Sequence, residues 1–487
     1  MKRIISMIAV LALLLGLCAC GGNTQSANGG EGNETSSGSS FMVGYGKVDI
    51  TPVEYGISMS GYGNQTTRLS TGLLSYIYAI AVAVSDTEGN TAILMSVDMC
   101  NLGGVLCTQL RDWIKSNYGI PTENVIISSI HQHSTPDPDY NTNYAKDLLE
   151  GMKDAVDLAL ADRAEAEMYI NKVETNAMSF LRRYWGNDGG FISSHSGDRS
   201  SGYARYESES DKEMRLIKFV RKDKKPVIMV NFQGHPHMGT DGSSTMIHSD
   251  WPGVMRDMVE LELDAQCIYF SGAGANLNSS TPITEDVVSA DFREHGERAA
   301  EYVIGAEDSY TKAETGPVVC VEQTQTYEAD HTLDHLLDVA KIVDNARKNH
   351  GMSAAHQKVK EFPELNSAYQ ATAIINKALQ GQTKDLSYTV ITFGDVAISG
   401  HSYEMFDTNG KELREGTVGN EFYAAEDQLE NPFPMTFVAS LANAGNGYIP
   451  SYTGFANGGY ERDITRYAQG TGELIVGDVL HVLNDLR

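Results

Sequence analysis

The chain has 487 residues and a formal net charge of −27, from 37 basic and 64 acidic side chains. A protein this acidic is repelled by the phosphate backbone, which excludes nucleic acid as a partner. Of the six cysteines, four lie beyond residue 20 at irregular spacings without a Cys-x-x-Cys pair, and this argues against a disulfide framework and against a cysteine-based metal site.

The first twenty residues have the features of an export signal. Lys2 and Arg3 form a basic start, the segment from Ile4 to Leu17 is apolar, and small residues follow. The apolar run is too short to span a bilayer. The residues ending at Cys20 resemble the lipobox of bacterial lipoproteins, which implies lipidation of Cys20 and an extracytoplasmic protein anchored to the membrane. An ordinary cleaved signal with an incidental cysteine is the alternative.

Residues 21–40 are mostly Gly, Ser, Asn, Thr and Gln. Such a segment buries too little apolar surface to offset its ordering entropy, so it predicts a flexible tether. No second linker of this kind follows. Residues 41–487 are therefore predicted to form one large domain, or two tightly interleaved ones.

Strand-length apolar runs alternate with segments of helical periodicity along this domain. In chain order, we predict strands at 78–84 and 91–99, a helix at 105–115, a strand at 125–130, a helix at 143–160, a hairpin of 216–220 and 227–232, a helix at 251–263 and a strand at 267–270. Helices at 285–304, 332–349 and 368–380 follow, then strands at 387–398 and 435–441 and a closing helix at 473–486. This order favours an α/β or α+β fold with a large mixed sheet flanked by helices.

Histidines gather just beyond two of these strands. Strand 125–130 leads into His131 and His133, whose side chains point the same way if the segment is extended. Strand 227–232 leads into His235 and His237, and His248 follows. An exposed coil has no reason to collect five of the thirteen histidines at two strand ends. The pattern favours a metal site at the strand ends over a hydrogen-bonded surface pair.

Two further strand ends could supply oxygen ligands. The predicted strand 387–398 leads to Glu404, and the predicted strand 435–441 leads to Tyr448. No Gly-x-Ser-x-Gly elbow and no phosphate-binding loop occurs in the sequence from residue 41 onwards, so a serine elbow and a nucleotide site are disfavoured.

An ordered series of short motifs resembles the N-terminal catalytic domain of the neutral/alkaline non-lysosomal ceramidase family. The motifs are Gly44 to Pro52 (GYGKVDITP), Gly61 to Gly63 (GYG), Ser96 to Asp98 (SVD), Ser129 to Ser134 (SIHQHS), Arg182 to Tyr184 (RRY), His235-Pro236, Ser249 to Gly253 (SDWPG), Glu404, Tyr448 to Tyr452 (YIPSY) and Tyr460-Glu461. They occur in the family's order across residues 42 to about 485.

This resemblance implies a Zn2+-dependent amidohydrolase that uses metal-activated water to cleave the amide of an N-acyl lipid such as ceramide, or of a related small amide, in sphingolipid metabolism. The residues that it implies are the metal ligands His131, His235, Glu404 and Tyr448, the proton carrier His133, and the oxyanion-stabilising Arg182 and Tyr460.

Two alternatives remain open. One is a zinc esterase or another hydrolase on the same site, and the other is a surface-binding lipoprotein that kept the fold without the chemistry. The family also has a loop with a serine that is sometimes proposed as catalytic. Asn278 or Ser279 occupies that position here, and whether Ser279 takes part is left open.

Overall fold

The structure is a computed structural model that describes residues 40–63, 65–193, 202–239, 243–279 and 291–487. The predicted signal, the tether up to residue 39 and Cys20 lie outside these ranges, so lipid anchoring stays a prediction. The chain from Ser39 to Arg487 forms one compact unit. Among the described residues, no helix is both long enough and apolar enough to cross a bilayer.

The larger of the two main sheets is nine-stranded and mixed. Its order is β14-β12-β11-β6-β1-β3-β4-β5, with β16 paired to β6. The strands are β1 (Met42–Asp49), β3 (Tyr78–Ser85), β4 (Thr91–Val97), β5 (Val125–Ser129), β6 (Ala164–Glu174), β11 (Glu213–Arg221), β12 (Val227–Phe232), β14 (Gln266–Ser271) and β16 (Thr311–Ala313). The β4–β5 and β12–β14 pairs are parallel. Strand β4 is buried on both faces, which explains its continuous apolar run.

The second main sheet has four strands in the order β17-β18-β19-β21. They are β17 (Val318–Glu328), β18 (Thr383–Phe393), β19 (Val396–His401) and β21 (Met435–Ala439). The prediction of one strand over 387–398 is wrong, because this segment is a hairpin of β18 and β19. The chain turns at Gly394, whose φ of +63° suits glycine. Most residues on both sides of Gly394 are buried and apolar, so the sequence pattern does not indicate the turn.

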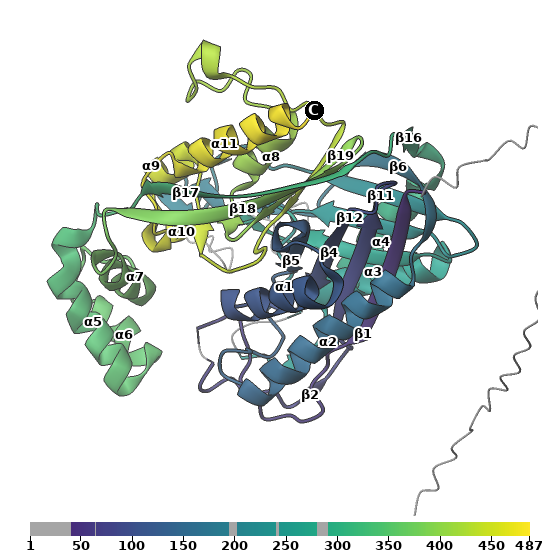
Figure 1. Cartoon of the computed structure of the whole chain (residues 1–487). Coiled ribbons are helices and arrows are strands. Elements are labelled where there is room, and N and C mark those ends of the chain that lie inside the picture. Colours follow the sequence, from purple (N-terminus) through teal and green to yellow (C-terminus); the bar gives the residue numbers. More distant parts are fainter. Residues whose placement is uncertain (1–39, 64, 194–201, 240–242, 280–290) are drawn as a thin grey trace, which may run out of the picture. The chain divides into compact units, whose positions relative to one another are not determined.

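The two sheets pack face to face, and helices cover their outer faces (Figure 1). Ile80 and Leu94 of the large sheet share one core cluster with Ile398 of the second. The large sheet is covered by α1 (Gly104–Tyr118), α2 (Thr142–Ala161), α3 (Asp250–Glu262) and α4 (Phe292–Gly305), and the second sheet by α8 (Asp407–Glu415) and α11 (Thr471–Asp485). The predicted mixed-sheet fold flanked by helices is confirmed.

Three helices inserted between β17 and β18 form an apolar cluster of their own (Figure 1). They are α5 (Leu337–His350), α6 (Met352–Val359) and α7 (Ala368–Ala378). The predicted helix 285–304 corresponds to α4, which begins at Phe292 after the capping residue Asp291. Residues 285–290 lie outside the described ranges.

The remaining elements are short. They are β2 (Gly72–Leu73), β7 (Phe180–Leu181), β8 (Arg183–Trp185), β9 (Phe191–Ser193), β10 (Arg205–Tyr206), β13 (Met246–Ile247), β15 (Leu277–Asn278), β20 (Glu404–Met405), β22 (Tyr448–Ile449), α9 (Tyr452–Asn457), α10 (Tyr460–Ile464), and the 3-10 turns Thr122–Asn124, Glu307–Ser309, Asp334–Leu336 and Ala425–Asp427. Several of them carry site residues.

Helix α2 lies directly on β1 because two glycines leave no side chain between them. A Cβ atom on Gly46 would lie 2.1 Å from the carbonyl oxygen of Ala155, and one on Gly44 would lie 1.9 Å from that of Ala159. We expect Gly46→Ala to lower the free energy of unfolding by about 3 kcal/mol, because the helix backbone must move.

Urea denaturation measures this loss. Gly305→Ala is the control, because a Cβ atom at this position meets no atom within 4 Å. The free energy of unfolding of the Gly305→Ala protein should stay within about 0.5 kcal/mol of wild type. A Gly46→Ala protein as stable as the control would contradict the close packing of α2 on β1.

Candidate metal and substrate site

A cavity of about 1140 Å³ contains the predicted site residues in its wall. All seven of them line it: His131, His133, Arg182, His235, Glu404, Tyr448 and Tyr460. A cavity of this volume is large enough to enclose most of an organic ligand.

The two histidine segments come from strands near opposite ends of the large sheet. His131 follows β5 and His235 follows β12, and five other strands separate these two in the sheet order. The sheet curls so that its ends approach each other. Ser96 Oγ on β4 donates a hydrogen bond of 2.5 Å to the carbonyl oxygen of Tyr269 on β14. This curl brings the ends of β5 and β12 to one cavity.

Three imidazoles meet nitrogen to nitrogen at this point. His133 Nε2 lies 3.3 Å from His131 Nε2 and 3.2 Å from His235 Nε2. Glu404 Oε2 lies 3.2 Å from His131 Nε2. One ligand atom from each of His131, His235 and Glu404 lies within 4.8 Å of the other two. Neighbouring ligands of a tetrahedral zinc ion are roughly 3.3 Å apart, so this donor set fits such an ion.

The backbone around the imidazoles is specialised to orient them. His131 has a φ of +66°, a left-handed conformation that costs a non-glycine residue roughly 1–2 kcal/mol. Its Nδ1 donates to the carbonyl oxygen of Cys100 at 2.9 Å, which leaves Nε2 facing the cluster. Gly61, with a φ of +110°, lies against His133, where a Cβ atom would be 2.8 Å from the ring. Strained backbone of this kind is typical of functional sites.

Glu404 and Tyr448 are held side by side by a two-residue parallel strand pair. Glu404 on β20 is directly opposite Tyr448 on β22, and the Glu404 N–H donates to the carbonyl oxygen of Gly447 at 2.8 Å. Burial and the Glu404 carboxylate raise the pKa of Tyr448 well above its usual value. Tyr448 is therefore a neutral phenol unless a nearby cation stabilises its phenolate.

The imidazoles differ in their electrostatics. Burial alone would lower the pKa of His131, but the Glu404 carboxylate outweighs it and the net pKa is well above the usual value. Burial and the neighbouring imidazoles hold the pKa of His235 well below the usual value. The cluster thus contains a carboxylate that favours positive charge on its neighbour His131, beside the buried and neutral His235, an environment that a divalent cation would satisfy.

Arg182 also lines the cavity, and Glu461 holds it in place. Arg182 Nε donates to Glu461 Oε1 at 2.8 Å, and Glu461 Oε2 accepts from Arg183 Nη1 at 2.6 Å and from Ser193 Oγ at 2.9 Å. Within the described part of the chain, Arg182 Nη2 has no hydrogen-bond partner. Burial opposes the charge of Arg182, but Glu461 outweighs this and raises its pKa. Arg182 is therefore a fixed cation whose Nη2 is available to donate a hydrogen bond to a ligand.

The cavity wall also contains residues to which the motifs assign no role. The ring centroid of His237 lies 4.5 Å from that of His235, and burial lowers the pKa of His237 to about 3. Tyr369 on α7 places its ring centroid 6.4 Å from that of Tyr460, and its hydroxyl donates to the carbonyl oxygen of Tyr62 at 3.4 Å. His237 was visible in the sequence beside His235, whereas nothing in the sequence connected α7 with the site.

Ser279 is not among the residues that line the cavity. It is fully buried behind Gly234, where a Cβ atom on the glycine would lie 2.8 Å from Ser279 Oγ. This position does not present the hydroxyl to a substrate in the cavity.

Comparisons with known proteins agree on one family. Residues 41–290, just over half of the chain, match the family described as neutral/alkaline non-lysosomal ceramidase, N-terminal. A protein of Arabidopsis thaliana named neutral ceramidase 2 is 23% identical over 330 residues, which are 64% of this chain and 39% of that protein. The neutral ceramidase of Drosophila pseudoobscura is 32% identical over 136 residues, which are 27% of this chain and 17% of that protein.

The match to these curated relatives thus covers well under half of their length. The crystal structure of neutral ceramidase from Pseudomonas aeruginosa superimposes with a TM-score of 0.66 at 16% identity, covering 92% of this chain and 75% of that one. This likeness supports a common fold. With the family match over residues 41–290, these findings show that the chain belongs to the neutral/alkaline non-lysosomal ceramidase family.

Proposed function

We propose that this chain is a zinc-dependent amidohydrolase that cleaves the amide bond of an N-acyl lipid such as ceramide. The observation that carries the proposal is the convergence of imidazole nitrogens and the Glu404 carboxylate in the wall of a cavity of about 1140 Å³. The names of the relatives supply the substrate class.

The proposed ligands are His131, His235, Glu404 and Tyr448. Imidazole nitrogens favour zinc over calcium or magnesium, which prefer oxygen ligands. When bound, zinc supplies two effects, a lowered pKa of water and polarisation of a carbonyl oxygen.

His133 is the proposed proton carrier. Its Nε2 lies 3.2–3.3 Å from Nε2 atoms of the two histidine ligands, within reach of a water molecule that attacks the amide carbon. An imidazole there can accept the proton of the water and then donate it to the leaving amine. The leaving amine must be protonated. A residue that can donate this proton therefore favours amide hydrolysis over a site that only binds a ligand.

Arg182 and Tyr460 are the proposed oxyanion donors. The free Nη2 of Arg182 and the phenol of Tyr460, both in the cavity wall, would hydrogen-bond to the carbonyl oxygen as it becomes negative. Glu461 keeps Arg182 from reorienting, so the donor costs little reorganisation when the reaction occurs.

For the whole chain, we propose that residues 41–487 act as one catalytic domain and that the lipidated Cys20 holds it outside the cell membrane. The support for the anchor is the sequence of the first twenty residues.

Chelation and zinc reconstitution test the proposed function. We expect about one zinc per purified chain, hydrolysis of a short-chain N-acylsphingosine, loss of that activity with 1,10-phenanthroline, and its return with added zinc. Metal content is measured by inductively coupled plasma mass spectrometry, and the released amine by chromatography.

An ester analogue of the same acyl chain separates the alternatives. Turnover of the ester without turnover of the amide would favour an esterase. No zinc after reconstitution, or no turnover of either substrate by the zinc-loaded protein, would overturn the enzymatic proposal.

A further inference from the structure

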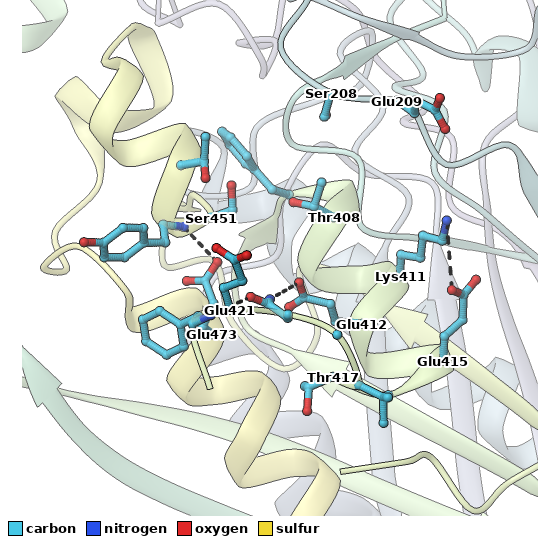
Figure 2. Close-up of a pocket in the computed structure, with 18 of the residues that line it drawn as sticks. Ser208, Glu209, Thr408, Lys411, Glu412, Glu415, Thr417, Glu421, Ser451 and Glu473 are labelled. Carbon is cyan, nitrogen blue, oxygen red and sulfur yellow. Dashed lines mark hydrogen bonds and ion pairs between the residues drawn. The ribbon is translucent and has the colours of Figure 1, made fainter. Parts of the chain in front are cut away.

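A second cavity, of about 1070 Å³, lies beside α8, the segment that follows it, and the first turn of α11. It shares no lining residue with the histidine cavity. Its wall is strongly acidic and contains the glutamates Glu207, Glu209, Glu412, Glu415, Glu421 and Glu473 against the single cation Lys411 (Figure 2). Such a wall concentrates negative potential in a cavity of ligand size.

Two of these glutamates have a cation close by. Glu207 accepts two hydrogen bonds from Arg183, at 2.6 and 2.9 Å, and Glu415 lies 4.0 Å from Lys411. The other four glutamates (209, 412, 421 and 473) have no Lys, Arg or His nitrogen within 4.0 Å of their carboxylates in the described part of the chain. Figure 2 shows Glu412, Glu421 and Glu473 grouped together, apart from the pair of Lys411 and Glu415.

Glu473 presents a buried, unsatisfied oxygen in this wall. The residue is 3% exposed, and its Oε1 accepts from the Tyr452 N–H at 2.8 Å and from Asn409 Nδ2 at 3.1 Å. Its Oε2 has no hydrogen-bond partner among the described residues, and neither does Oε2 of the neighbouring Glu412. Buried carboxylate oxygens are costly to leave unpaired, so these two indicate a missing positively charged group.

The protonation of this pair agrees with a missing cation. Burial and then the Glu473 carboxylate raise the pKa of Glu412 to about 7, and burial raises the pKa of Glu473. Both carboxylates resist ionisation because they are buried without a positive charge beside them. A bound cation would favour their ionised forms.

The geometry suits an organic cation better than a metal ion. In the described ranges, groups of three or more His, Cys, Asp or Glu with ligand atoms within 4.8 Å of one another occur at His131 and do not include these glutamates. No three of these carboxylates therefore place ligand atoms within the distance that a metal ion would require. Phe422 and Tyr452, with ring centroids 5.6 Å apart, also line the cavity, and aromatic faces attract ammonium groups.

We propose that the second cavity is a binding site for an organic ammonium ion, held by the carboxylates of Glu473 and Glu412 and by the rings of Phe422 and Tyr452. This site is separate from the histidine cavity and does not depend on the proposed hydrolase function.

Isothermal titration calorimetry on the full-length chain tests the proposal with choline chloride as a quaternary ammonium and ethanolamine hydrochloride as a primary ammonium. We expect at least one of them to bind, and Glu473→Gln to weaken that binding roughly tenfold or more. 3,3-Dimethyl-1-butanol, the neutral isostere of choline, should not bind. Calcium chloride should bind more weakly than the ammonium ion.

Glu412→Gln gives a second, independent readout. Because the cation displaces a proton from Glu412 near neutral pH, the apparent binding enthalpy at pH 7 should differ between phosphate and Tris buffers, and Glu412→Gln should reduce this difference. If the Glu473→Gln protein fails to fold, the affinity of the Glu412→Gln protein for the ammonium ion tests the site instead. Glu426→Gln removes one exposed negative charge outside the cavity wall and should bind like the wild type.

Four results would overturn the site. They are no binding of either ammonium ion up to about 10 mM, equal binding of the neutral isostere, tighter binding of calcium than of the ammonium ions, or unchanged affinity in both the Glu473→Gln and the Glu412→Gln proteins.

Discussion

His131→Ala should remove the bound zinc together with turnover, whereas His133→Ala should keep the zinc and lose turnover. His131 contributes an Nε2 that faces Glu404 at 3.2 Å, so its loss opens the proposed ligand set and should lower zinc affinity by more than about 100-fold. Loss of a proton carrier instead lowers kcat by about 10²- to 10⁴-fold without changing the metal content. Metal analysis and steady-state kinetics on both variants measure the two effects separately.

This pair of variants is decisive because distances alone do not separate the two roles. The Nε2 atom of His133 lies as close to those of His131 and His235 as one zinc ligand lies to another. Equal loss of zinc in both variants would make His133 a ligand and refute the assignment of proton transfer to it. His481→Ala, which changes an exposed histidine on α11, should retain both zinc and kcat.

Glu461→Gln should lower both stability and turnover. Glu461 is fully buried between the guanidinium groups of Arg182 and Arg183. Removing its charge leaves buried cations undercompensated, which typically costs about 3–5 kcal/mol in the free energy of unfolding. Because Arg182 also loses its fixed orientation, we expect kcat to fall by about 10- to 100-fold, with a smaller change in KM.

Asp98→Asn is the matched control for this experiment. Asp98 is fully buried, accepts hydrogen bonds of 2.7 and 2.6 Å from Arg256, and does not line either cavity. The Asp98→Asn protein should lose a comparable free energy of unfolding, measured by denaturant unfolding, while its kcat per folded molecule stays near the wild-type value. An equal fall in kcat in both variants, or none in Glu461→Gln, would contradict a positioning role for Glu461.

Much of the secondary structure was predictable from the sequence because local pattern decides it. Helix α2 places apolar residues at helical spacing, and the strands β3, β4, β5 and β12 are continuous apolar runs. The sequence pattern does not predict strands β6 and β17, because many of their side chains are polar and neither strand is a long apolar run. The sequence pattern predicts one strand where the structure has the β18–β19 hairpin, because the residues on both sides of the turn are buried and mostly apolar.

The kinds of side chain at the candidate site were also visible in the sequence, since His131, His133, His235 and Glu404 all follow predicted strands. Which of these strand ends meet was not visible. That depends on the curl of the large sheet, which brings β4 against β14 and so joins segments more than one hundred residues apart. The sequence includes Glu461 in a motif without a role. The contact of Glu461 with Arg182 and the presence of Tyr369 at the site could not be predicted, because their partners come from distant elements.

By itself, the sequence determined the positions of the longer helices and of the most apolar strands of the two main sheets, the kinds of side chain at the strand ends, and the family motifs. These depend on periodicity and residue type, which are local properties of the chain. Only the tertiary structure decided that seven separated side chains line one cavity, that Glu461 holds Arg182 in place, and that an acidic second cavity exists beside α8 and α11. The physical reason is that these features arise from packing between distant segments, which no local pattern encodes.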